Sequence, residues 1–84
     1  MNITKKYFSW IRVKLEKSHE LIELNQTISF KELQNNLISK DPVFQEIFED
    51  KSVKYFLNLR EIDDDNLTLN NGDILAFLPP VTGG

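Results

Sequence analysis

Residues 71–80 carry the clearest structural signal in the chain: Asn71-Gly72-Asp73-Ile74-Leu75-Ala76-Phe77-Leu78-Pro79-Pro80. Asn-Gly is a strong turn signal, because both residues accept the left-handed backbone of a tight turn. The apolar run that follows has no polar alternation, which is typical of a strand covered on both faces. The two prolines have no amide hydrogen, so sheet pairing has to stop there. The sequence therefore predicts a buried strand over residues 74–78, followed by a stiff segment that cannot join the sheet.

The N-terminal region is predicted to form two strands. Residues 3–15 largely alternate, with Ile11, Val13 and Leu15 on one side and Arg12 and Lys14 on the other. This is the period of a half-buried strand. A polar turn at residues 16–18 leads to a second run at residues 20–24, and the pair is predicted to be an antiparallel hairpin.

The main helix is predicted to begin at a capping box. The Ser29 hydroxyl can accept from the amide of Glu32, while the Glu32 side chain reaches back to Ser29. Ile28 and Leu33 have the spacing of a hydrophobic staple. Four residues share one helical face, namely Phe30, Leu33, Leu37 and Ile38.

A second, shorter helix is predicted directly after the first. Pro42 disfavours helical geometry at Asp41, so the first helix should end near Lys40. The same Asp-Pro pair can start a new helix. Two i, i+4 apolar pairs support this helix, namely Val43 with Ile47 and Phe44 with Phe48.

The remaining segments complete a mixed sheet. Residues 53–59 are predicted to form a third strand and residues 61–62 a short fourth one. Leu67 and Leu69 are predicted to insert into the core from a polar loop. By spacing, the aromatic core consists of Phe30, Phe44, Phe48 and Phe56. We therefore predict an α+β fold, in which a mixed sheet of about five strands packs on one main helix and a short second helix.

Composition limits the classes of function. Eighty-four residues suffice for one domain, and 40% hydrophobic with 27% charged residues is ordinary for a globular protein. There is no cysteine, which excludes disulfides and thiolate zinc sites. No signal-peptide-like run and no stretch of about 20 apolar residues occurs, so we expect no membrane partner and a cytoplasmic location. The net charge is −3 and no basic stripe with stacking aromatics is present, so nucleic acid is not expected as a partner.

Two polar features are interpreted as ordinary surface. His19 has no neighbouring ligand cluster and is predicted to be an exposed turn residue rather than a metal ligand or catalytic base. Residues 63–65, three aspartates, lack the alternating ligands and closing glutamate of a calcium loop. They are expected to solvate a loop, and docking on a basic patch of a partner is left open as an alternative.

The final residues suggest the chemistry. Val81, Thr82, Gly83 and Gly84 follow the two prolines and, if extended, could reach about 13 Å. A diglycine has no side chains to widen it, so its terminal carboxylate can enter a narrow tunnel in another protein. A carboxylate is a poor acyl donor and needs activation, most simply as an acyl-adenylate made from ATP, before a nucleophile such as persulfide sulfur can attack. A frayed end or a cloning remnant is the plainer reading of a diglycine alone.

Residues 72–84 resemble the C-terminal signature of the small subunit of molybdopterin synthase, the MoaD family of the MoaD/ThiS superfamily. That family's usual ending is Gly-Asp-x-hydrophobic-Ala-hydrophobic-Phe-Pro-Pro-Val-x-Gly-Gly. Phe8-Ser9-x-x-Arg12 is similar to the family's Phe-Ala-x-x-Arg, and Asn58 falls where the family often has asparagine. Leu78 departs from the usual phenylalanine. In the family a short helix follows the first strand, which leaves residues 10–15 open between strand and helical turn.

The resemblance implies a β-grasp, ubiquitin-like domain over residues 1–78 and an extended tail over residues 79–84. It also implies a sulfur carrier that is not catalytic alone, binds no cofactor or metal, and becomes a terminal thiocarboxylate. In that role Gly84 is adenylated and carries the sulfur, and Gly83 keeps the tail thin. Partner contacts are expected from the rest of the tail and the last strand, namely Thr82, Val81, Pro80, Pro79, Leu78 and Phe77.

The implied partners are three proteins. An adenylyltransferase related to ubiquitin-activating enzymes would use ATP, and a sulfur donor protein would supply sulfur. The large subunit of molybdopterin synthase, in a heterotetramer, would transfer it to a cyclic pyranopterin. Three alternatives stay open: a carrier for thiazole synthesis or tRNA thiolation, a ubiquitin-like protein modifier, and an interaction domain with an inert tail.

Overall fold

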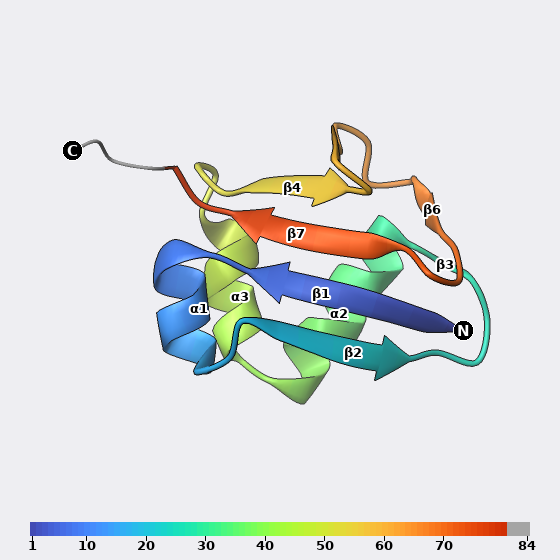
Figure 1. Cartoon of the computed structure of the whole chain (residues 1–84), viewed down its shortest axis with the longest axis horizontal. Helices are drawn as coiled ribbons and strands as arrows, with labels where there is room; N and C mark the ends of the chain where they lie inside the picture. Colours follow the sequence, from blue (N-terminus) through green and yellow to red (C-terminus); the bar gives the residue numbers. More distant parts are fainter. Residues whose placement is uncertain (81–84) are drawn as a thin grey trace.

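The structure is a computed structural model that describes residues 1–80 (Figure 1). The first half of the chain contains β1 (Asn2–Tyr7), α1 (Ser9–Leu15), β2 (His19–Glu23), β3 (Ile28–Ser29) and α2 (Phe30–Lys40). The second half contains α3 (Val43–Glu49), β4 (Lys54–Leu57), β5 (Arg60–Glu61), β6 (Thr68–Leu69) and β7 (Ile74–Leu78). Within residues 1–80, no helix is long and apolar enough to cross a membrane.

The main sheet has five strands in the order β2-β1-β7-β4-β5. β1 and β7 are parallel at its centre, whereas β1–β2, β4–β7 and β4–β5 are antiparallel. The three helices lie on one face of this sheet and leave the other face open (Figure 1). A two-stranded ladder of β3 and β6, which the sequence did not predict, lies beside it. The predicted α+β fold with a mixed sheet is confirmed.

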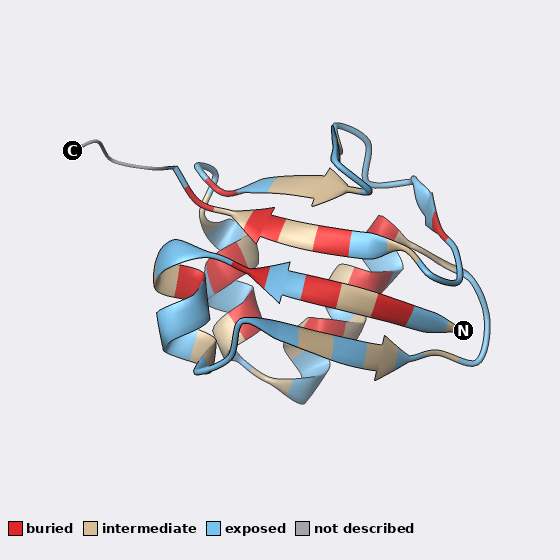
Figure 2. Cartoon of the chain, viewed as in Figure 1, coloured by how far each residue is buried: buried red, intermediate tan, exposed pale blue. Residues whose placement is uncertain are grey.

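The core lies between the sheet and the helices (Figure 2). Phe77 of β7 is fully buried at its centre, with ring centroids 5.3 Å from Tyr7, 5.4 Å from Tyr55 and 6.1 Å from Phe44. Leu75 is buried beside it. Such edge-to-face and tilted aromatic contacts are favourable beyond the area that they bury.

The prediction that β7 is covered on both faces is wrong. Leu75 and Phe77 face the helices, but Ile74 is 40% exposed, and Ala76 and Leu78 are only partly buried. The strand lies between two neighbours, yet nothing in the described chain covers its outer side. Its apolar run therefore supplies one core face and one apolar surface.

Residues 9–15 form the helix α1, so the prediction of a strand from alternation is wrong and the helical alternative is correct. Ile11 is fully buried and Leu15 packs against the core, whereas Val13 is 76% exposed. Positions 11 and 15 share a face in both a strand and a helix, because a separation of four fits either period. β1 and β2 are still antiparallel, but α1 lies in their connection.

The two other helices follow the predicted pattern. Ser29 Oγ accepts from the Glu32 amide at 3.1 Å, and Glu32 Oε1 accepts from the Ser29 amide at 3.0 Å, which completes the capping box. α2 ends at Lys40 as predicted. Asp41 Oδ1 accepts from the Val43 amide at 3.0 Å and so helps to start α3.

Two of the predicted core residues are placed wrongly. Phe56 does not belong to the core: it is only partly buried, and its neighbours Tyr55 and Leu57 pack inward instead. Because side chains alternate along a strand, Tyr55 and Leu57 share the face opposite to Phe56. Leu69 is fully buried as predicted, but Leu67 is 38% exposed.

Candidate functional site

The start of β7 is fixed by a network around Asn58. Asn58 Nδ2 donates to Asp73 Oδ1 at 2.9 Å, and Asn58 Oδ1 accepts from the Ile74 amide at 2.9 Å. The Asn70 amide donates to Asp73 Oδ2 at 2.7 Å, and the Gly72 amide donates to the carbonyl of Asn2 at 2.8 Å. These bonds fix the register of β7 against both neighbouring strands. They give a structural reason for an Asn and a Gly-Asp pair in this sequence.

Gly72 has a positive φ of 88° at the turn before β7. A Cβ atom at this position would meet nothing within 4 Å, so its requirement is conformational rather than spatial. Glycine adopts this backbone region without steric cost.

The open face of the sheet carries an apolar concavity of about 470 Å³. We call it the outer apolar surface; it is formed by β1, β4, β7 and the turns that follow β1 and β4. Its lining residues are Lys6, Phe8, Phe56, Asn58, Leu59, Ile74, Ala76 and Leu78. Of these residues, only Leu78 was predicted from the sequence to contact a partner. Alternation along β4 and β7 was the signal that could have revealed Phe56 and Ile74.

The predicted site residues have different positions. Phe77 is fully buried in the core, so its predicted place on a docking surface is wrong. Leu78 lies on the outer apolar surface, and its role in partner contact stays a prediction. β7 ends at Leu78, as the two prolines predict; Pro79 is buried and Pro80 is exposed. Val81, Thr82, Gly83 and Gly84 lie outside the described residues.

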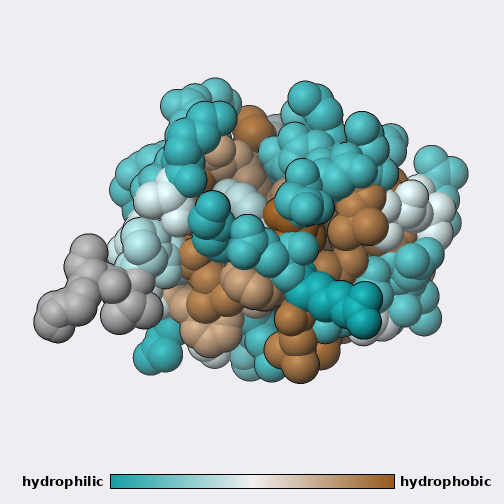
Figure 3. All heavy atoms as spheres, turned by 90° about the horizontal axis from the view of Figure 1, so that it is seen from above, coloured by the Kyte–Doolittle hydropathy of each residue, from teal (hydrophilic) through white to brown (hydrophobic). Residues whose placement is uncertain are grey.

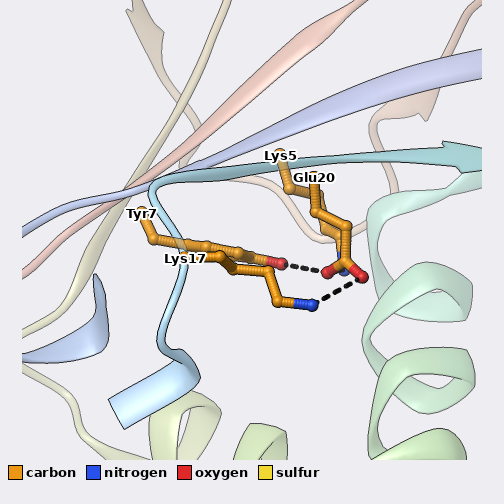
Figure 4. A network of polar contacts seen from close by, with 4 residues as sticks. All are labelled: Lys5, Tyr7, Lys17 and Glu20. Atoms are coloured by element: carbon orange, nitrogen blue, oxygen red, sulfur yellow. Dashed lines mark hydrogen bonds and ion pairs between the residues drawn. The ribbon is translucent and has the colours of Figure 1, made fainter. Parts of the chain in front are cut away.

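A partly buried polar network lies on the other side of the sheet (Figure 4). Lys5 is 2% exposed; its Nζ lies 3.2 Å from Glu20 Oε1 and 4.8 Å from the centre of the Phe44 ring. Glu20 also accepts from the Tyr7 hydroxyl at 3.0 Å and from Lys17 Nζ at 3.1 Å. This cluster was not predicted from the sequence, although Lys5 lies between Ile3 and Tyr7 on the inward face of β1.

Burial shifts the pKa values of two groups in this network, Lys5 and Tyr7. It lowers the pKa of Lys5, because desolvation outweighs the charge of Glu20. It raises the pKa of Tyr7, whose hydroxyl therefore stays protonated as the donor to Glu20. The four groups connect β1, β2 and the turn after α1, because Lys5, Tyr7 and Lys17 all contact Glu20. We assign them a structural role.

The prediction that His19 is exposed is confirmed, but His19 is the first residue of β2 and is paired with Lys6, so its predicted place in a turn is wrong. His19 is exposed, and its Nδ1 lies 3.1 Å from Ser18 Oγ. Over residues 1–80, no cluster of three or more His, Cys, Asp or Glu side chains could hold a metal ion. Asp63, Asp64 and Asp65 are exposed in the loop after β5.

Comparison with protein families identifies a match to the ThiS family over residues 6–84. The chain belongs to the ThiS family. It is thus a member of the MoaD/ThiS superfamily of ubiquitin-like sulfur carriers, as the resemblance of its last residues indicated. The match includes the four residues beyond Pro80. No curated protein matches the chain.

Several solved structures are similar to this ThiS-family chain. The putative molybdopterin converting factor subunit 1 from Pyrococcus furiosus is 25% identical, with a TM-score of 0.80 over 96% of this chain and 99% of that one. A protein–protein complex of subunits 1 and 2 of the molybdopterin-converting factor from Helicobacter pylori 26695 gives 26% identity, a TM-score of 0.69 and full coverage of both chains. SAMP1 from Haloferax volcanii is 18% identical with a TM-score of 0.82 and full coverage of both, and this likeness shows the β-grasp, ubiquitin-like fold alone.

Proposed function

We propose that this chain is the sulfur-carrying small subunit of molybdopterin synthase. The observation that carries the proposal is that the family match extends to Gly84. It therefore includes the tail that follows the central strand, which has the sequence Pro79-Pro80-Val81-Thr82-Gly83-Gly84. Two similar structures, 25% and 26% identical, are described as molybdopterin converting factor subunits. Tails of the related thiazole and tRNA-thiolation carriers usually lack the Pro-Pro pair. The pair therefore favours molybdopterin synthesis as the pathway of this chain.

The proposed chemistry takes place at the Gly84 carboxylate. A partner enzyme joins it to AMP from ATP and releases pyrophosphate. The terminal sulfur of a persulfide then attacks the acyl carbon and expels AMP, which forms an acyl disulfide. A thiol cleaves the sulfur–sulfur bond, leaving a thiocarboxylate on Gly84 and a disulfide on the donor. The large subunit then directs that sulfur to a cyclic pyranopterin.

In this scheme the residues of this chain bind the partner and position the reactive end of the tail. Gly83 and Gly84 have no side chains, so the reactive end fits a narrow channel. Pro79 and Pro80 restrict the direction in which the tail leaves β7. Leu78 and the outer apolar surface beside it face the partner. The ATP, the base and the sulfur donor all belong to partner proteins, which is consistent with a carrier that is not catalytic alone.

Three partner proteins follow from the proposal. They are an adenylyltransferase related to ubiquitin-activating enzymes, a sulfur donor protein, and a large subunit with which two copies of this chain form a heterotetramer. The Helicobacter pylori complex of subunits 1 and 2 supports a partner subunit for this chain. A cytoplasmic location accompanies the proposal.

Intact-protein mass spectrometry tests the chemistry. The chain is incubated with the adenylyltransferase of its own organism, ATP and a persulfide donor. The expected product is heavier by the difference between one sulfur and one oxygen atom, and a matched chain that lacks Gly84 should not gain it. Sulfur transfer by the shortened chain would refute the mechanism.

The same measurement separates the alternatives. Species heavier by a whole chain would indicate a protein modifier, and an unchanged mass would indicate an interaction domain. If the thiocarboxylate forms but yields no molybdopterin with the large synthase subunit, the carrier serves another pathway.

A further inference from the structure

β2 is an edge strand, and half of its backbone groups face away from the sheet. Within residues 1–80 it pairs with β1 alone, and no other labelled element lies beyond it in Figure 1. The Leu24 amide donates to the Met1 carbonyl at 2.7 Å, and the Tyr7 amide donates to the Ser18 carbonyl at 2.9 Å. Hydrogen-bonded pairs alternate with non-bonded pairs along an antiparallel ladder. The even-numbered residues of β2 therefore bond to β1, and the odd-numbered ones do not.

Three residues of β2 direct their amides and carbonyls toward the free edge of the sheet, namely His19, Leu21 and Glu23. Within residues 1–80, the ladder with β1 leaves these groups without a backbone partner. All three side chains are exposed on the open face, and that of Leu21 is 60% exposed. A row of unpaired backbone groups beside exposed side chains can pair with another strand.

The strand that matches this edge is a second copy of β2. Two copies that run antiparallel and are centred on Leu21 place the two Leu21 residues opposite each other. His19 of each copy then lies opposite Glu23 of the other. Each opposite pair exchanges two backbone hydrogen bonds, so every outward amide finds a carbonyl. His19 Nδ1 is 3.1 Å from Ser18 Oγ, which leaves Nε2 to donate to the Glu23 carboxylate of the second copy. Apolar and oppositely charged pairs of this kind stabilise a ladder.

β2 also has few of the features that protect sheet edges from pairing. Lysine, proline and inward-pointing charges commonly give this protection. β2 has neither lysine nor proline, and its one inward charge, Glu20, is compensated by Lys5 and Lys17 of its own chain. The opposite edge strand, β5, has only two residues, both exposed and charged. Hydrophilic residues cover much of the side of the molecule that carries β4 (Figure 3). Of the two edges, β2 is the one suited to pairing.

We propose that this chain forms a two-fold dimer in which the β2 strands of two copies pair antiparallel about Leu21. The two main sheets then become one continuous sheet. A second copy fits because one register satisfies the backbone, the leucine contact and both His–Glu pairs at once. An edge of five residues buries little area, so the dimer is weak and forms at high protein concentration. β1 lies between β2 and β7, so pairing leaves the end of β7 and the outer apolar surface uncovered. The dimer does not depend on the proposed function.

Sedimentation equilibrium and amide NMR over a concentration series test the dimer. The largest concentration-dependent amide proton shifts are expected at His19, Leu21 and Glu23, because these amides gain hydrogen bonds. Leu21→Lys removes the leucine contact and places two ammonium groups opposite each other, so the dissociation constant of the dimer should rise about tenfold. Its melting temperature in dilute solution should stay that of the wild type. Val13→Lys adds the same charge at a position of α1 that is 76% exposed, and this matched control should dimerise like the wild type.

Charge exchange tests the register. His19→Glu places like charges opposite Glu23, and Glu23→Lys removes the carboxylate that His19 meets, so each variant alone should dimerise about fivefold more weakly than the wild type. A mixture of the two variants should form heterodimers, because the introduced glutamate of one chain faces the introduced lysine of the other. A wild type that stays monomeric up to its solubility limit would overturn the proposal. So would equal effects of Leu21→Lys and Val13→Lys, or a mixture that associates no better than either variant alone.

Discussion

Lys5 has a charged group at the edge of a core that is otherwise apolar and aromatic. Its side chain is 2% exposed, and its ammonium group has one carboxylate partner, Glu20, among the described residues. Taking a charge out of water is costly, so such a pair adds little net stability compared with an apolar side chain of similar size. Removal of only one partner is different, because it leaves a buried charge without compensation.

Glu20→Gln and Lys5→Met should therefore have unequal effects. Glu20→Gln leaves Lys5 buried without a carboxylate, and we expect a loss of about 2 kcal/mol in the free energy of unfolding. The loss stays below that of a fully buried pair because the Glu20 side chain is 37% exposed. Lys5→Met should lie within about 1 kcal/mol of the wild type. Urea denaturation measures both values, and equal losses would contradict this account.

The same carboxylate should contribute to acid sensitivity. Burial raises the pKa of Glu20, but the hydrogen bond from Lys17 and the charge of Lys5 outweigh it, so the pKa lies below its usual 4.5. The unfolded chain then takes up the proton first, and the stability from this group is present above pH 4.5 and lost as the pH falls further. Melting temperatures measured down this range should fall less steeply for Glu20→Gln than for the wild type. Parallel curves would show that Glu20 does not contribute.

At the scale of elements, local sequence signals predicted the ends of α2 correctly but not the structure of residues 10–15 or the position of Phe56. The capping box at Ser29 and Glu32 and the Pro42 boundary predicted both ends of α2, because each signal depends on neighbouring residues alone. The strand predicted for residues 10–15 was wrong, since Ile11 and Leu15 satisfy both periods and only packing against α3 and the sheet decides between them. Phe56 was assigned to the core because its strand offers apolar residues on both faces.

Asn58 connects two elements that are distant in sequence. Its side chain bonds to Asp73 and to the Ile74 amide, and its backbone has a φ of +50°. Asn58→Ala removes both hydrogen bonds and retains an unfavourable backbone, so we expect a loss of about 2 kcal/mol in the free energy of unfolding. Asn58→Gly removes the same bonds without the backbone penalty and should lose about 1 kcal/mol. Chemical denaturation compares the two, and a larger loss for glycine would contradict the assigned backbone cost.

At the scale of the whole molecule, one face of the main sheet forms the core and the other face forms the outer apolar surface. Phe77, Leu75 and Tyr7 face the helices and form the core, whereas Ile74, Ala76 and Leu78 stay on the open face. The tail motif could be found in the sequence because it is contiguous. The outer apolar surface could not, because it collects residues from β1, β4 and β7 that only the sheet order brings together.

This division predicts that folding and sulfur transfer can be separated. Gly83→Val adds a branched side chain next to the reactive end and leaves every core residue of the domain unchanged. We expect thiocarboxylate formation to fall about a hundredfold, because small misplacements at a reacting group have effects of that size. The melting temperature should stay that of the wild type. Phe77→Ala should do the reverse, lowering the free energy of unfolding by about 4 kcal/mol through the cavity in the core. Calorimetry and intact-mass kinetics on both variants measure the two properties, and a Gly83→Val chain that melts early would show that the tail also supports the fold.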